Sequence, residues 1–116
     1  MRVHTRKPVL FLLISFLILI EVVKNPVGAE VKMKMTGIVE LDLHGKNQYQ
    51  AQIAIDAALR RAGKGVYRLR IIHGFHHGTT LREMIRTHYQ SHPKILRISA
   101  GDNDGITDLI LRELIS

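Results

Sequence analysis

The chain has 116 residues, which is enough for one domain of ordinary size and too few for a multidomain enzyme. Seventeen Lys and Arg residues against ten Asp and Glu give a formal net charge of +7, which favours polyanionic partners such as nucleic acid or anionic lipid. Because the chain has no cysteine, disulfide-stapled scaffolds, thiolate zinc sites and thiol catalysis are excluded.

A short apolar run divides the chain into a hydrophobic leader, residues 1–32, and the expected domain, residues 33–116. Residues 9–20 read VLFLLISFLILI after a basic start, and even when extended to residue 23 the run is shorter than the roughly 20 apolar residues of a membrane span. The leader holds five of the 17 basic and two of the ten acidic residues. The domain therefore carries twelve basic and eight acidic residues, a net charge of +4.

Three origins of the leader stay open. The small residues 27–29 fit a secretory signal that is cleaved after Ala29, and a retained leader would anchor the protein to a membrane through residues 9–23. Met33 and Met35 stand just before the first expected strand, so translation from either would leave the leader out. We expect this last case, which predicts a cytoplasmic protein; the other two predict an exported or a membrane-anchored one.

Four strands are expected in the domain. Apolar residues at every second position predict strands over residues 38–43 and 66–72. Two further strands are expected over residues 95–100 and 107–114, joined by a turn at residues 101–105 that is rich in Gly, Asp and Asn.

Two helices separate these strands, which gives the order βαβαββ. The first begins after Asn47, which with Gln50 forms a capping box, and ends about four turns later at Gly63. The second opens with a capping box of Thr80 and Glu83 and ends at residues 91–93. Its inner stripe is expected to consist of Leu81, Met84, Ile85 and His88.

The expected fold class is α/β, an α+β two-layer sandwich with a four-stranded mixed sheet and both helices on one face. The first two strands should run parallel through a right-handed crossover, so that His44 and His73, each followed by glycine, converge at one sheet edge. Strand alternation places a set of charged residues on the uncovered face of the sheet, namely Glu40, Asp42, Arg68, Arg70, Arg97 and Arg112.

Two short motifs carry a family resemblance over residues 38–114. Residues 41–45 (LDLHG) and 71–74 (IIHG) resemble the LDLHG motif and the start of the HGxG motif of the Smr (small MutS-related) domain, stand-alone bacterial type. Leu81-Arg82 and Gly105 also fit. The resemblance implies a fold similar to the C-terminal domain of translation initiation factor three.

The same resemblance implies a nucleic-acid partner, because the family includes DNA-nicking and RNA-cleaving endonucleases. One departure weakens an assignment of cleavage: His76 stands where the second glycine of HGxG is expected, and the next glycine is Gly78. From the resemblance we expect an endonuclease that acts on RNA or structured DNA. The departure at His76 leaves the alternative of a non-catalytic nucleic-acid-binding module. A membrane is an expected partner only if the leader is retained.

Three residues are predicted to be catalytic. Cleavage of a phosphodiester needs a base, an acid and donors for the charged transition state. His44 and His73 can supply the first two, since an unperturbed imidazole titrates near pH 6.5. Asp42 can orient a histidine or bind Mg²⁺ or Mn²⁺. The competing interpretation makes these histidines ordinary turn residues, and a metal cluster of His73 with residues 76 and 77 is poorly spaced.

A further set of residues is predicted to bind the nucleic acid. The N–H groups of Gly74 and Gly78 are expected to point outward as a seat for phosphate beside the second helix. Phe75 can stack on a base or fold back onto that helix. The arginines of the sheet face can form a stripe that binds the phosphate backbone, or a solvated face balanced by carboxylates. The full set is Gly45, Gly74, Phe75, Gly78, Arg68, Arg70, Arg82 and Arg97.

Overall fold

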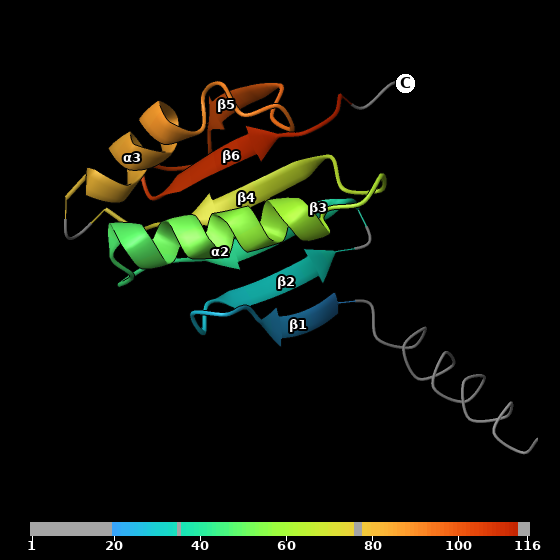
Figure 1. Ribbon diagram of the computed structural model, residues 1–116, viewed down its shortest axis with the longest axis horizontal. Coiled ribbons are helices and arrows are strands. Elements are labelled where there is room, and N and C mark those ends of the chain that lie inside the picture. The colour runs from blue at the N-terminus through green and yellow to red at the C-terminus, as the bar shows by residue number, and fades with distance from the viewer. Residues whose placement is uncertain (1–19, 35, 76–77, 114–116) are drawn as a thin grey trace, which may run out of the picture.

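The computed structural model describes residues 20–34, 36–75 and 78–113, so most of the apolar run of the leader, together with His76 and His77, lies outside the described residues. Six strands form one sheet in the order β1-β2-β3-β4-β6-β5. The elements in chain order are β1 (Ile20–Lys24), β2 (Glu30–Lys34), β3 (Ile38–Asp42), α2 (Gln48–Arg61), β4 (Arg68–Ile72), α3 (Thr80–His88), β5 (Arg97–Ala100) and β6 (Ile106–Ile110) (Figure 1).

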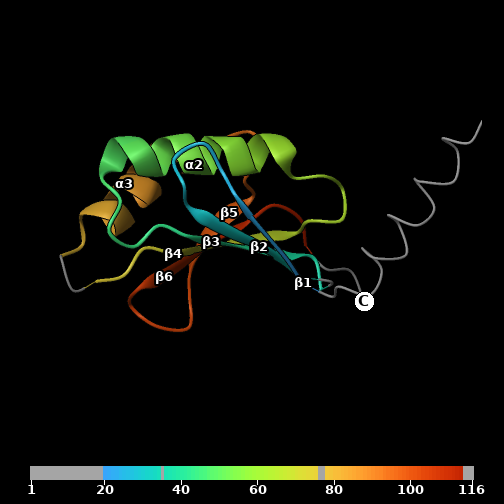
Figure 2. The same ribbon diagram turned by 90° about the horizontal axis from the view of Figure 1, so that it is seen from below.

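The predicted fold class is confirmed. β3 and β4 pair in parallel, and the remaining pairs of neighbouring strands are antiparallel, so the sheet is mixed. Figure 2 shows α2 and α3 on the same side of this sheet, and no other helix of the described residues covers its second face. The predicted order βαβαββ is present from β3 onward.

The sheet has six strands, however, and the prediction of four was wrong. β1 and β2 form an antiparallel hairpin, and β2 continues the sheet beyond β3 with Val31 opposite Leu41. The turn between them uses Gly28 at φ 76°, a left-handed conformation that favours glycine. The sequence analysis missed both strands because it divided the chain by composition at residue 32, which lies inside β2. Of the helices in the described residues, none is long and apolar enough to cross a membrane.

The core lies between the helices and the helix-facing side of the sheet. Alternation in β3 and β4 turns Val39, Leu41, Leu69 and Ile71 inward, and each is at most 6% exposed. The α2 helix meets them with small and branched side chains at helical spacing, which lets it lie close to the strands. The buried residues of α2 are Ala51, Ala54, Ile55, Ala57 and Leu59.

The α2 helix begins as predicted but ends differently. Asn47 Oδ1 accepts a hydrogen bond from the Gln50 N–H at 2.8 Å, and Gln50 Oε1 accepts one from the Asn47 N–H at 3.1 Å, which confirms the capping box. At the other end Ala62 is extended, so Gly63 makes no left-handed cap. The N–H of Ala62 donates to the carbonyls of Ala58 and Leu59, and the Lys94 ammonium also donates to the Leu59 carbonyl, a long-range contact that local spacing does not reveal.

The predicted start and inner stripe of the second helix were partly wrong. Thr79 is the N-cap of α3 and makes no side-chain capping bond, so the box of Thr80 and Glu83 does not form. His88 is exposed, whereas Tyr89 is buried and donates its hydroxyl hydrogen to Asp56 Oδ1 at 2.8 Å. Position 88 lies four residues after Met84 and position 89 four residues after Ile85, so both fit helical spacing, and the larger aromatic ring takes the core position.

Candidate functional site

The carboxyl ends of β3 and β4 lie at the same end of the domain as the N-termini of α2 and α3 (Figure 1). Residues from these ends line a groove. Its volume is about 860 Å³, which is in the range of pockets that take whole small ligands. The start of each helix adds a partial positive charge at this edge. The groove is lined by His44, Gly45, Lys46, Asn47, Gln48, Tyr49, His73, Gly74, Phe75, Gly78, Thr80 and Leu81.

His44 is exposed and is held by Asp42. Nδ1 of His44 lies 2.6 Å from Asp42 Oδ1, which also accepts the backbone N–H of His44 at 3.2 Å. Because a carboxylate only accepts hydrogen bonds, Nδ1 carries the proton and Nε2 keeps its lone pair in the neutral ring. Among the described residues no hydrogen bond involves Nε2, and the side chain is 74% exposed. His44 therefore presents an oriented basic nitrogen at the groove.

His73 lines the same groove but in a different setting. It is 5% exposed, its Nδ1 lies 2.8 Å from the carbonyl oxygen of Gly74, and its Nε2 lies 2.8 Å from Thr107 Oγ1. The carbonyl can only accept, so Nδ1 donates to it and, in the neutral ring, Nε2 accepts the hydroxyl hydrogen of Thr107. Both ring nitrogens are thus engaged within the protein, and the loop after β4 is tied to β6.

The surroundings of His73 keep it neutral. Burial lowers the pKa of His73 below its ordinary value of 6.5, and the positive charges of Arg82 and Arg86 lower it further, while the bond to the Gly74 carbonyl acts in the opposite direction. Arg82 thus stands close enough to the groove to act on His73 through its charge. His73 consequently differs from His44 in exposure and in the freedom of its ring nitrogens.

The glycine after each histidine shapes the site, although not as the sequence suggested. Gly45 and Gly74 have φ values of 79° and 75°, left-handed conformations that turn the chain away at the two strand ends. The N–H of Gly74 donates to the carbonyl of Gly105 at 3.0 Å, and that of Gly78 donates to Phe75 at 3.1 Å. The expected outward-pointing pair of donors was therefore wrong, because the Gly74 N–H bonds the distant Gly105 and the Gly78 N–H closes a turn.

Gly105 fixes the position of the second loop. Its carbonyl accepts the N–H groups of both His73 and Gly74, at 2.9 and 3.0 Å. A Cβ at position 105 would lie 3.2 Å from Gly74 Cα and 3.4 Å from Phe75 Cδ1, so the loop rests directly on this glycine. The two histidine loops are also neighbours, since a Cβ at Gly74 would lie 3.7 Å from that of His44.

The arginines of the sheet face are paired with carboxylates. Asp108, with 4% of its side chain exposed, lies 3.0 Å from Arg68 Nη1 and 3.2 Å from Arg70 Nε. Arg70 also faces Glu40 at 3.7 Å, and Glu40 bonds Lys34 at 2.9 Å. Because Asp108 pairs with both guanidinium groups, the interpretation of Arg68 and Arg70 as a free phosphate-binding stripe is not supported. The set of charged residues predicted for this face did not include Asp108.

The remaining predicted arginines lie at different distances from the groove. Arg97 pairs with Glu113 and is opposite Ile110, which is also opposite Arg68 at the start of β4. His73 follows the other end of β4, so about 16 Å of extended chain separates it from Arg68. Arg97 lies at the same far end of the sheet as Arg68. Of the four predicted arginines, Arg82 on α3 is the one whose charge acts at the site.

Sequence reasoning missed four residues that build the site. Two of them, Lys46 and Tyr49, line the groove on either side of Asn47, whose capping role was predicted. Their position just after His44-Gly45, at the end of a strand, was a signal in the sequence that a basic and an aromatic residue would lie at the groove. Thr107 and Asp108 hold the site and the sheet face through contacts about 34 to 40 positions away in sequence, which no local pattern reveals.

A metal bound through Asp42 finds little support in the donor set. Within residues 20–34, 36–75 and 78–113 no group of three or more His, Cys, Asp or Glu side chains is placed to hold an ion. The residues that line the groove carry no carboxylate, and Asp42 Oδ1 is taken by His44. The described residues do not fit a metal centre held by the protein alone.

Fold and site together define a two-layer α+β domain whose groove lies at the carboxyl ends of two parallel strands. The Smr domain family matches residues 41–108, more than half of the chain, and the protein therefore belongs to this nucleic-acid-binding, nuclease-related family. The Smr domain of Thermus thermophilus MutS2 is similar in structure, with a TM-score of 0.57 and 29% sequence identity over 64% of this chain and 98% of that one. No curated protein matches the sequence.

Proposed function

We propose that this Smr domain is an endonuclease that cleaves RNA, with His44 as the general base. The observation that carries the proposal is the contact between Asp42 and His44, which fixes the tautomer of an exposed imidazole at the mouth of a groove. A carboxylate that holds Nδ1–H orients the ring and stabilises the imidazolium that forms when Nε2 takes a proton.

RNA is favoured as the substrate because, of the two described histidines that line the groove, one has a free ring nitrogen. In RNA the nucleophile is the neighbouring 2′-hydroxyl, so a single base begins the reaction. His44 Nε2 takes the proton of this hydroxyl, the 2′-oxygen bonds to phosphorus, and the bond from phosphorus to the 5′-oxygen breaks. The 5′-oxygen takes a proton from water, which leaves a 2′,3′-cyclic phosphate and a 5′-hydroxyl.

The charge that develops on the phosphate faces positive groups of the groove. Lys46 follows the Gly45 turn directly, and the first turns of α2 and α3 direct N–H groups and their partial positive charge to the same edge. His73 serves as a positioning residue, because its two nitrogens hold Gly74 and Thr107 and its imidazole stays neutral.

A test uses the full chain and a labelled single-stranded RNA. We expect His44→Ala to lower the cleavage rate about 10²- to 10⁴-fold, the usual contribution of a general base, and Asp42→Asn to lower it in the same direction. Replacing the 2′-hydroxyl by hydrogen at one position should block cleavage there. His88→Ala, which removes an exposed histidine at the end of α3, is the matched control and should cut like the wild type.

Two results would count against the proposal. Cleavage that persists in His44→Ala would place the chemistry elsewhere, and cleavage at a 2′-deoxy position would show hydrolysis by water. Parallel reactions with a chelator and with Mg²⁺ or Mn²⁺ measure any need for an ion. Structured DNA, assayed in the same way, tests the other substrate expected from the sequence.

The second candidate is a nucleic-acid-binding module without cleavage. It is favoured by the burial of His73 and the engagement of both its nitrogens, which leaves the site one proton-transfer group instead of two. This function predicts binding that weakens with salt, as contacts to phosphate require, and no product in any of the reactions above.

The cellular location remains a prediction. We propose a cytoplasmic protein whose translation starts at Met33 or Met35, because RNA and structured DNA are intracellular substrates. β2 spans Glu30–Lys34, so a start at Met33 would remove β1 and part of β2 from the sheet, and a start at Met35 would remove both strands. The N-terminal peptide of the native protein, read by mass spectrometry, decides: Met33 or Met35 supports the proposal, Glu30 indicates export and Met1 indicates a retained leader.

A further inference from the structure

Two aromatic side chains line the groove and are exposed over about half of their surface or more. Tyr49, in the first turn of α2, is 73% exposed, and Phe75, in the loop after β4, is 49% exposed. The described residues include four exposed large hydrophobic side chains, and these two line the same groove as His44. The other two, Met33 and Leu96, lie outside the groove lining.

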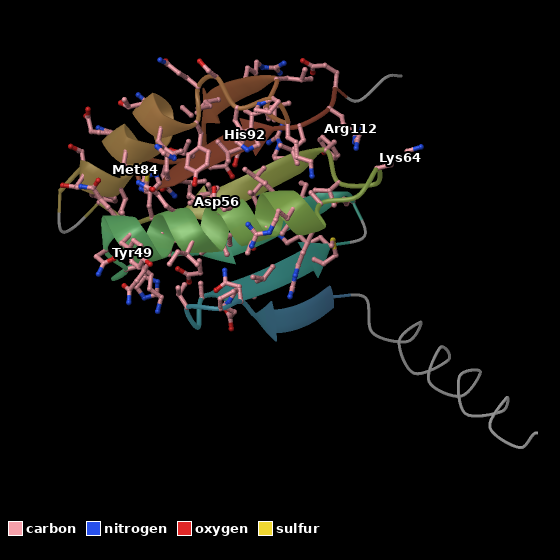
Figure 3. The ribbon with its side chains drawn as sticks, viewed as in Figure 1. Tyr49, Asp56, Lys64, Met84, His92 and Arg112 are labelled. Atoms are coloured by element: carbon pink, nitrogen blue, oxygen red, sulfur yellow. The ribbon has the colours of Figure 1, made fainter. Side chains whose placement is uncertain are left out.

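Tyr49 is not part of the core packing of α2. The buried residues of α2 begin at Ala51, and in Figure 3 Tyr49 extends outward from the start of that helix. Phe75 lies beside Gly105, where the missing side chain leaves room for the ring edge. Phe75 is thus supported from below by backbone while about half of its surface stays open to the groove.

We propose that Tyr49 and Phe75 form a pair of stacking surfaces that accept unpaired bases on the two sides of the phosphodiester held at His44. This inference rests on the proposed function and adds its substrate class: single-stranded nucleic acid, or the unpaired part of a folded one. Each base of a duplex is stacked on its neighbours, so its face is not available to a protein ring, whereas the bases of a single strand are.

Residues that line the groove together with the two rings suit a nucleotide backbone. His44 and Lys46 lie between Tyr49 and the strand ends in sequence, and both line the groove. A strand whose bases stack on Tyr49 and Phe75 would bring its phosphate to these cationic and basic groups. Stacking needs no particular base, because every base has a π face, so the discrimination is between unpaired and paired strands.

The test measures binding apart from cleavage. The full chain carrying His44→Ala is titrated into a 12-nucleotide fluorescein-labelled RNA without self-complementarity, and into the same strand annealed to its complement. We expect Tyr49→Ala and Phe75→Ala, each added to this background, to weaken single-strand binding about 5- to 150-fold and to leave duplex binding unchanged. Tyr49→Phe, which keeps the ring, should restore single-strand binding.

Leu96→Ala is the matched control, because it removes an exposed apolar side chain that does not line the groove. Circular dichroism of each variant separates a loss of stacking from a loss of fold. The inference is overturned if Tyr49→Ala binds the single strand as the parent does, or if duplex affinity falls by the same factor. If cleavage depends on His44 but Tyr49→Ala has no effect on binding, the proposed function stands and the stacking pair is refuted. If the aromatic variants weaken single-strand binding but no cleavage occurs, the stacking pair stands and the endonuclease function is refuted.

Discussion

The substitution Asp108→Asn tests the ion pairs that occupy the helix-free face of the sheet. Asp108 is buried and contacts two guanidinium groups, at 3.0 Å for Arg68 and 3.2 Å for Arg70. Asparagine keeps the size and one acceptor oxygen but removes the negative charge. The two arginines would then face each other across a neutral amide, with Glu40 as the carboxylate that remains near Arg70.

The expected cost follows from the burial of the three side chains. Removing one partner from a buried ion pair costs about 3–5 kcal/mol, because the other charge is left without compensation. Arg70 is 16% exposed and Arg68 is 31% exposed, so water compensates part of the loss and the lower end applies. We expect the free energy of unfolding to fall by about 3 kcal/mol, which in a domain of this size lowers Tm by roughly 12–24 °C.

The measurement is urea unfolding followed by circular dichroism, with Asp104→Asn as the control. Asp104 lies exposed in the turn before β6, so its substitution makes the same change of charge and should alter stability by less than about 0.5 kcal/mol. If Asp108→Asn unfolds at the same urea concentration as Asp104→Asn, the arginines do not depend on Asp108. They would then have to be reconsidered as groups available to nucleic acid.

Two further predictions concern the loop that carries His73. Burial lowers the pKa of His73 below 6.5, so the unfolded chain takes up a proton first as the pH falls. The stability that this histidine contributes is therefore complete above about pH 6.5 and is lost as the pH falls below it. His73→Gln should reduce the difference between the urea midpoints at pH 7.5 and pH 5.5, and an unchanged difference would contradict the assignment. Gly105→Ala should cost about 1–3 kcal/mol in urea unfolding because its Cβ would press on Gly74, whereas Gly63→Ala, with open space around it, should be neutral; equal effects would show that the loop yields.

Local patterns in the sequence predicted most of the fold. Alternation in β3 and β4 and the reciprocal bonds of Asn47 and Gln50 depend on residues a few positions apart, and they were found. The hairpin of β1 and β2 was missed because the apolar leader hid a strand pattern that crosses residue 32. Division by composition fails where the end of an apolar segment also belongs to a sheet.

The site was predicted where it is local and missed where it is not. Asp42 and His44 are two positions apart, and the strand pattern places both at one sheet end. The partners of His73 and of the sheet-face arginines are Thr107 and Asp108, far away in sequence, so neither the engagement of His73 nor the neutralised arginines could be predicted. Such contacts follow from strand order, which a single sequence does not specify.

The place of β6 has a consequence for how the protein is made. β6 comes last among the described strands, yet it lies between β4 and β5 and is the partner of both. Until residues 106–110 have left the ribosome, β4 keeps an open hydrogen-bonding edge and β5 has no neighbour in the sheet. The nascent chain therefore presents a strand edge of the kind that pairs with other chains, and rapid insertion of β6, or a chaperone that shields β4, protects it from aggregation.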